Sequence, residues 1–292
     1  MRYALLRCNR ERASLGQQVF DTAAEALMND QAAGLRALTR KAVRLLPVTS
    51  AARGVGHTTC VVNLAAAFSA SGLRVVVIDA GRAMVAPSLG LKAKYDLFHV
   101  LTGERTFSET IQSADTFSVL PAAKGLDEFV SSGSSAGDLF GAFTSLFSLF
   151  DMVILAAPPA AVSQLLGPAG DVLIVLNDEA DSIKATYGFL KKLSEESGFQ
   201  QFQILFNDVQ DVTQANDGYA RLADAAKRFF NAHLSLAGIV PRDAALRRAG
   251  LLRSHVFRRG SPSGNSTAKV AFSRAVVDVA SWQLHEFSAA QE

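Results

Sequence analysis

The chain has 292 residues, 49% of them hydrophobic and 19% charged, with a formal net charge of +2. It is therefore long and apolar enough to bury a large core, and the slight net charge gives no reason to predict nucleic-acid binding. No apolar run approaches the roughly 20 residues of a membrane span, and the N-terminus lacks the long apolar core of a secretory signal, so we expect a soluble, cytoplasmic protein.

Residues 1–41 are expected to form a largely helical extension before the main domain. The most distinctive stretch is DQAAGLRAL, residues 30–38, in which an acid begins a helix and apolar residues recur at helical spacing. Gly34 costs about 1 kcal/mol inside a helix, so this helix is expected to form firmly only against a partner protein. The residues expected to contact that partner are Asp30, Gln31, Leu35, Arg36 and Leu38. The alternative is a helix that packs on the protein's own core.

Seven short runs rich in Val, Ile, Leu and Phe follow, separated by segments of helical period. They cover residues 45–50, 74–80, 117–122, 150–157, 171–177, 202–208 and 236–241. Strands that are apolar on both faces are typical of a parallel sheet covered by helices on both sides. We therefore predict an α/β domain over residues 42–259, with a mainly parallel β-sheet sandwiched by helices. Pro47 is the exception, because a proline removes a hydrogen bond from a central strand.

The turn before the first helix of this domain is typical of a phosphate-binding loop. The stretch SAARGVGHTTCVVNLA, residues 50–65, leads into an amphipathic helix that Gly72 ends. In such loops the glycines let backbone N–H groups point at phosphates, and the helix adds the positive end of its dipole. A lysine normally precedes the threonine pair and bridges two phosphates, but His57 stands there, and a neutral imidazole on a short side chain cannot replace it. The loop residues predicted to belong to a vestigial nucleotide site are Gly54, Val55, Gly56, His57, Thr58 and Thr59.

This loop resembles that of the MinD/ParA group of deviant phosphate-loop (P-loop) ATPases, whose pattern is KGGxGKT followed by threonine or serine. Aligned on the pattern, the two lysines fall at Ala52 and His57, so both are absent. The resemblance also implies a D-x-D pair after the second strand and a metal-associated aspartate in a motif like FDxxxIDTPP. Asp79 matches the first acid of the pair, Gly81 replaces the second, and FDMVILAAPPA places Ala156 at the third position. The resemblance therefore implies a P-loop NTPase fold. The substitutions predict that its nucleotide site no longer hydrolyses ATP efficiently.

Within that group the chain resembles the flagellar-number regulators of the FlhG (FleN) branch, from about residue 29 to residue 280. The segment DQAAGLRAL matches the DQAxxLRxL segment of that branch, which stimulates FlhF, a GTPase of the signal-recognition-particle (SRP) type. The branch also implies an asparagine and a proline-led loop near the adenine, which correspond here to Asn207 and to Pro241 and Asp243. An ordinary strand end and an ordinary loop are the alternative for these positions. Together with Asp79, the residues Asn207, Pro241 and Asp243 are predicted to complete the vestigial nucleotide site.

The C-terminal part, residues 260–292, is predicted to be a linker, GSPSGNST, followed by a final helix over residues 268–287. Because this helix is weakly basic and contains acids, it is expected to pack on the core or bind a partner rather than a membrane. An arginine-rich stretch, residues 242–259, precedes it. We interpret that stretch as a solvated face, with binding to an acidic partner as the alternative.

Together these features predict a regulator that acts by binding and has no catalytic residue. The expected partner is an FlhF-type SRP GTPase, with other flagellar assembly or regulatory proteins as further partners, and membrane contact is expected to be weak or to pass through partners at the cell pole. No cofactor or metal is expected: ATP and Mg²⁺ should bind at most weakly, and Cys8 and Cys60 have no metal-ligand spacing. Two alternatives stay open: an active, atypical ATPase of this group, and a regulatory scaffold in cellulose synthesis or secretion.

Overall fold

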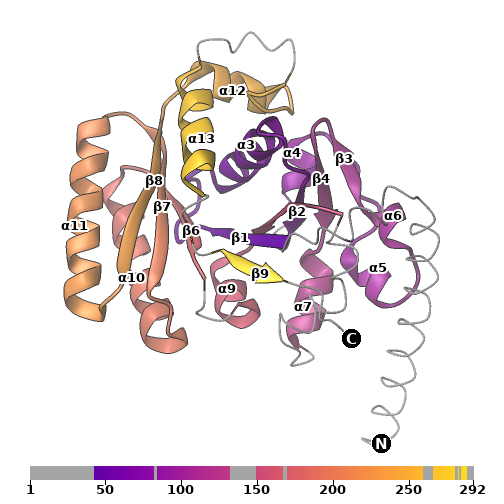
Figure 1. Ribbon diagram of the computed structural model, residues 1–292, viewed down its shortest axis with the longest axis horizontal. Helices are drawn as coiled ribbons and strands as arrows, with labels where there is room; N and C mark the ends of the chain where they lie inside the picture. Colours follow the sequence, from indigo (N-terminus) through magenta and orange to yellow (C-terminus); the bar gives the residue numbers. More distant parts are fainter. Residues whose placement is uncertain are drawn as a thin grey trace, which may run out of the picture.

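A central β-sheet with helices on both faces makes up the described part of the chain (Figure 1). The structure is a computed structural model that describes residues 43–81, 84–131, 149–166, 170–258, 266–279, 282 and 284–287. The partner contact predicted for Asp30, Gln31, Leu35, Arg36 and Leu38 lies outside these residues.

The sheet is mainly parallel, as the sequence predicts. The strands are β1 (Val43–Thr49), β2 (Val75–Asp79), β3 (Gln112–Ala114), β4 (Phe117–Pro121), β5 (Met152–Ala156), β6 (Val172–Leu176), β7 (Gln201–Val209) and β8 (His233–Pro241). Their order is β3-β4-β2-β5-β1-β6-β7-β8, and only the pair β3-β4 along this order is antiparallel. Because β1 lies inside the sheet with β5 and β6 as neighbours, the segment that follows β1 begins near the middle of the sheet's carboxyl edge.

The helices divide between the two faces of the sheet according to where their apolar side chains are buried. One face is covered by α3 (His57–Ala70), α4 (Val85–Ser88), α12 (Ala244–Leu251) and α13 (Thr267–Asp278). The other face is covered by α5 (Leu97–Leu101), α6 (Phe107–Thr110), α7 (Ala123–Ser131), α9 (Pro159–Leu165), α10 (Ala180–Ser197) and α11 (Val212–Phe230). Each face therefore has its own apolar core. No helix in the described ranges is long and apolar enough to cross a membrane.

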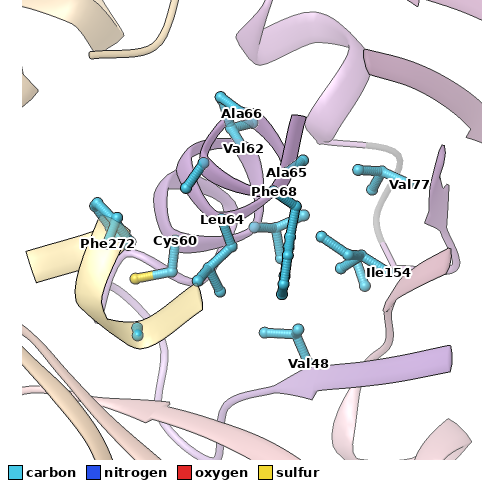
Figure 2. Close-up of a cluster of buried hydrophobic side chains, with 14 of the residues drawn as sticks. Val48, Cys60, Val62, Leu64, Ala65, Ala66, Phe68, Val77, Ile154 and Phe272 are labelled. Carbon is cyan, nitrogen blue, oxygen red and sulfur yellow. The ribbon is translucent and has the colours of Figure 1, made fainter. Parts of the chain in front are cut away.

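Helix α3, which follows the predicted phosphate loop, is enclosed on all sides. Every residue from Cys60 to Phe68 is buried. Figure 2 shows Phe68 directed toward the strand residues Val48 and Ile154, while Cys60 lies beside Phe272 of α13. Burial raises the pKa of the Cys60 thiol, which keeps it protonated. The packing on both sides fixes the position of α3 and hence of the loop in front of it.

The C-terminal segment packs on the core, but the predicted helix is too long. Helix α13 ends at Asp278, and residues His285–Phe287 form a short strand, β9, antiparallel to the start of β1. The physical reason is a free strand edge: β6 pairs with β1 only from Val48 onward, so the first residues of β1 lack a neighbour on that side, and β9 takes the place. A three-residue strand that completes another strand's edge leaves no periodic signal in the sequence.

The position of Pro47 inside β1 has a related explanation. On one edge of β1 the pairing with β9 reaches Leu45, and the pairing with β6 begins at Val48. Pro47 therefore lies between the two partner strands, where a missing N–H group interrupts neither ladder.

Candidate nucleotide site

The turn between β1 and α3 has the backbone geometry of an anion-binding loop. Gly54 and Gly56 are both left-handed, with φ of 79° and 80°, a conformation that favours glycine. Gly56 is the N-cap of α3, no side chain caps this helix, and its first turn carries no acidic residue. The N–H groups of the first turn, which contains His57, Thr58 and Thr59, therefore have no side-chain acceptor, and the helix dipole favours an anion in front of them.

Asn207 of β7 holds this loop from a distant strand. Its Nδ2 donates to the carbonyl oxygen of Val55 at 2.9 Å, and the residue is only 4% exposed. A Cβ added to Gly56 would overlap Nδ2 of Asn207. Gly56 is thus required twice, for its left-handed backbone and for the close approach of the amide. The structure brings Asn207 together with the six predicted loop residues.

Two further polar residues at the same edge of the sheet are not indicated by the motif. Thr49 ends β1, Asn177 directly follows β6, and within the described residues Oγ1 of Thr49 and Oδ1 of Asn177 are buried without a hydrogen-bond partner. Among the same described residues, Oδ1 of Asn207 is also buried without a hydrogen-bond partner. In sequence, the signal is a polar residue that ends an apolar run. Buried polar atoms of this kind require a partner, which water or a ligand can provide.

His57 turns back toward the sheet. Its Nε2 lies 2.9 Å from the carbonyl oxygen of Val48 in β1, and because a carbonyl only accepts, this nitrogen carries the proton. Burial lowers the pKa of His57, against the smaller opposite effect of that hydrogen bond, so the imidazole is neutral near neutral pH. The same carbonyl also accepts the N–H of Ala157 at 3.1 Å. His57 therefore ties the loop to β1 and supplies no cation.

Strand β2, which lies on the far side of β5 from β1, offers one carboxylate at this edge of the sheet. The register aligns Val48 with Ala156 of β5 and Ala156 with Asp79 of β2. Oδ2 of Asp79 accepts the N–H of Val85 at 2.8 Å, and burial raises the pKa of Asp79 despite this and other backbone hydrogen bonds. Asp79 thus anchors the start of α4. Among the described residues, no group of three His, Cys, Asp or Glu side chains is placed to hold a metal ion.

Asp243, predicted to belong to the nucleotide site, joins two helices. Oδ1 accepts the two backbone N–H groups at the start of α12, and Oδ2 accepts three donors at the start of α13. The five donors are the N–H groups of Ala245, Leu246 and Ala268 and the hydroxyls of Ser266 and Thr267. Burial raises the pKa of Asp243, but these hydrogen bonds outweigh it and hold the pKa at about 2. Its carboxylate is occupied by the protein itself.

The loop between Pro241 and Asp243 is also held on its other side. Pro241 ends β8 and lies opposite Val209 of β7. Arg242 donates from Nε and Nη2 to the two carboxylate oxygens of Asp208, each at 3.0 Å. This pair is exposed and contributes little to stability, but it orients the loop. It has no signal in the sequence.

A mainly parallel sheet, a first strand at its centre and a left-handed glycine turn leading into a helix define the phosphate-loop class of nucleotide-binding folds. The AAA-domain family matches residues 44–201, more than half of the chain, and the chain belongs to this family, within its MinD/ParA group.

Particular relatives narrow this assignment. The chain is 29% identical over 249 residues to the antiactivator FleN of Pseudomonas aeruginosa, covering 83% of this chain and 88% of FleN. It is 25% identical over 214 residues to the flagellum site-determining protein YlxH of Helicobacter pylori, covering 70% of this chain and 72% of YlxH. The solved structure of the cell division protein MinD of Aquifex aeolicus has the same fold, with a TM-score of 0.58 and 21% identity over 82% of this chain and 98% of MinD. The predicted fold and the predicted membership of the MinD/ParA group are confirmed.

The residues at this site do not fit the magnesium nucleotide that an ATPase of this group would hold. The left-handed glycines still form a phosphate cradle, and the unpaired Oδ1 of Asn207 still offers an acceptor. However, no lysine lies in the loop, Ala156 has no carboxylate, and Asp79 accepts a backbone N–H group at the start of α4. The loop has the backbone geometry that binds phosphate. It lacks the lysines that would neutralise phosphate charge and the acid that would hold the metal.

Replacing His57 by glutamine is expected to reduce the acid sensitivity of folding. Because burial lowers the pKa of His57 in the folded protein, the unfolded chain binds the proton more readily, and the folded state loses stability as the pH falls through the ordinary value of 6.5. Glutamine does not titrate and can donate a hydrogen bond to Val48. Urea unfolding above and below that pH should show the larger loss of free energy in the wild type.

A second histidine, the buried His255, serves as an internal reference for this comparison. Burial also lowers the pKa of His255, but His255 is present in both proteins and cancels in the difference. If the two proteins lose the same free energy of unfolding on acidification, the lowered pKa of His57 is contradicted.

Proposed function

We propose that the protein regulates the number or placement of flagella by binding a partner, with little or no ATP hydrolysis of its own. Its similarity to FleN and YlxH supports the flagellar process. The observation that carries the mechanism is the composition of the nucleotide site, where Ala52, His57 and Ala156 stand in place of two lysines and a metal-associated acid. A regulator that keeps the fold without these groups acts through its surface.

The energetic argument rests on the charged groups that are missing. One hydrogen bond to a charged group contributes about 1.5–3 kcal/mol, so the loss of both lysines weakens nucleotide binding by about 3 kcal/mol or more, which exceeds a hundredfold. Without an acid at position 156 the chain also lacks the group that would organise the metal ion during phosphoryl transfer. The bonds of His57 to Val48 and of Asn207 to Val55 hold the loop without a ligand.

The proposed partner is an SRP-type GTPase, and the proposed contact is the segment from Asp30 to Leu38. This segment precedes β1, whose first residue, Val43, lies at the sheet edge opposite the phosphate loop. In this proposal Gln31, Leu35 and Leu38 form the apolar and amide face of a helix that the partner orders, because Gly34 weakens the helix in isolation.

Phosphate release from ATP and from GTP, measured with the full-length protein and an FlhF-type GTPase, tests both halves of the proposal. We expect no ATP turnover above background and a stimulated rate of GTP hydrolysis. Substituting Gln31→Ala should reduce the stimulation, whereas His57→Gln should leave it unchanged, because only the first changes the proposed contact face.

The two competing functions predict different outcomes of the same measurement. ATP turnover that the partner or lipid stimulates, and that Thr58→Ala abolishes, would show an active, atypical ATPase. Absent GTPase stimulation, or equal stimulation by the Gln31→Ala protein, would favour a scaffold in cellulose synthesis or secretion.

A further inference from the structure

Helix α12 ends in a surface that is both apolar and basic. Leu251 and Leu252 are 80% and 62% exposed, and the neighbouring Arg247, Arg248 and Arg253 are also exposed. We define these five residues as the α12 tip. Single exposed apolar residues are ordinary on protein surfaces, but two adjacent leucines left in water at this level indicate a contact surface. A solvated face, as predicted for residues 242–259, explains why the arginines are exposed. It does not explain why Leu251 and Leu252 are exposed.

The α12 tip is held in a fixed shape. Leu246 and Ala249 bury the inner face of α12, while Arg247 lies one helical turn before Leu251 on the outer face. Beyond the helix, Arg253 adopts a left-handed backbone with φ of 52°, and its N–H donates to the carbonyl of Gly250 at 3.0 Å. The leucines therefore project from an ordered helix end.

A neighbouring element supports this ordered end. A Cβ placed on Gly90 would lie 3.2 Å from Cδ of Arg253, so the aliphatic stem of this arginine packs against the turn after α4. Figure 1 shows α12 at the outer end of the molecule, beyond the sheet and beside α13. An ordered, projecting end of this kind reaches a flat surface without rearrangement of the fold.

Among the described residues, no acidic side chain forms an ion pair with the arginines of the α12 tip. From Ala244 to Arg258 the chain has four arginines and no acidic residue. By contrast, Arg242 is paired with Asp208 and Arg74 with Asp151. Two copies of this surface would repel each other, so the charge argues against a self-complementary dimer here and favours an anionic partner.

We infer that the α12 tip docks on an anionic lipid surface. The leucines enter the boundary between headgroups and acyl chains, and the arginines contact lipid phosphates, which match the planar guanidinium group. Protein interfaces centre on aromatic and arginine anchors seated in pockets, and leucine is under-represented among such anchors. Two leucines on a projecting helix end fit a bilayer, which needs no pocket. The apolar face of α13 is buried against α3 and β8 and is not available for this contact.

Co-flotation of the full-length protein with vesicles tests this inference. We expect binding to phosphatidylcholine vesicles that contain phosphatidylglycerol, little binding to phosphatidylcholine alone, and weaker binding at higher salt. The double variant Leu251→Ser/Leu252→Ser should lower the partition coefficient at least about tenfold, because apolar insertion is lost. In the double variant Arg247→Glu/Arg248→Glu, each charge reversal should lower the partition coefficient by about fivefold or more.

Two matched variants separate the tip from general surface effects. Val277→Ser removes another exposed apolar side chain, on α13, and Arg221→Glu/Lys227→Glu makes the same change in net charge on α11. Both should bind these vesicles as the wild type does. The inference is overturned if the wild type does not float with the anionic vesicles, or if the leucine variant binds as well as the wild type, which would indicate attraction by charge alone.

Discussion

Replacing Gly56 by alanine is expected to lower the free energy of unfolding by about 3 kcal/mol. An alanine with left-handed φ costs about 1 kcal/mol, and displacing the amide of Asn207 from Val55 in a buried site costs a further 1–3 kcal/mol or so. The first cost follows from the φ of 80°, and the second from the overlap of a new Cβ with Nδ2 of Asn207. Urea-induced unfolding measures the difference.

Gly54 provides the matched control for this variant. Its φ of 79° is nearly the same, but no atom lies within 4 Å of the position that a Cβ would occupy. Gly54→Ala should therefore cost only about 1 kcal/mol. If Gly54→Ala and Gly56→Ala are equally destabilising, the contact with Asn207 contributes nothing.

A double-mutant cycle isolates the steric conflict between a methyl group at position 56 and the amide of Asn207. Asn207→Ala alone loses the hydrogen bond to Val55 and also opens the space that the new methyl group needs. The double variant Gly56→Ala/Asn207→Ala should therefore cost less than the sum of the two single variants. Strict additivity would mean that the loop and Asn207 are not coupled.

The fold was predictable because its strands are apolar on both faces. Runs such as VVVID and VLIVL differ so clearly from the helical segments that their order alone indicates a parallel sheet with helices on both sides. The two short strands, β3 and β9, were not predictable, because each is three residues long and is formed by pairing with an exposed strand edge. The prediction of a final helix up to residue 287 was wrong for the same reason, because His285–Phe287 pair with the edge of β1.

The candidate site was predictable only in part. The glycines and the threonine pair predict a phosphate-binding loop. The resemblance to the FlhG branch implies that Asn207 lies near the adenine, which stays a prediction; the structure shows its hydrogen bond to Val55 of the loop. The hydrogen bond from His57 to Val48 was not predictable, because the local sequence does not determine whether the imidazole points toward the sheet or toward a ligand. The network around Asp243 depends on α13, which begins 24 residues later in the chain, so no local pattern indicates it.

Hydrogen bonds to strands β1 and β7 hold the phosphate loop in place. His57 joins the loop to β1, Asn207 joins it to β7, and Asp79 joins the end of β2 to the start of α4. Each contact uses a polar group that could otherwise face a ligand. These hydrogen bonds fix the loop from within the protein, which supports the proposal that the protein acts by binding.

Replacing Asp243 by alanine is expected to lower the free energy of unfolding by about 3 kcal/mol, because the change uncaps α12 and leaves the start of α13 without its acceptor. Asp243→Asn is the matched variant: asparagine is an equally good N-cap for α12, but its amide lacks the charge and the second acceptor oxygen that α13 uses. We expect it to cost about half as much. Thermal or urea unfolding near neutral pH provides the comparison.

The acid dependence of these variants gives a second, independent result. The pKa of Asp243 is about 2 in the folded protein and 3.8 by default, so the stabilisation from its charge is complete above 3.8 and is lost as the pH falls from there toward 2. Other carboxylates titrate in the same range but are shared by the wild type and Asp243→Asn. The stability difference between these two proteins should therefore shrink across that range. A difference that stays constant down to pH 2 would show that the carboxylate of Asp243 is not what joins α12 to α13.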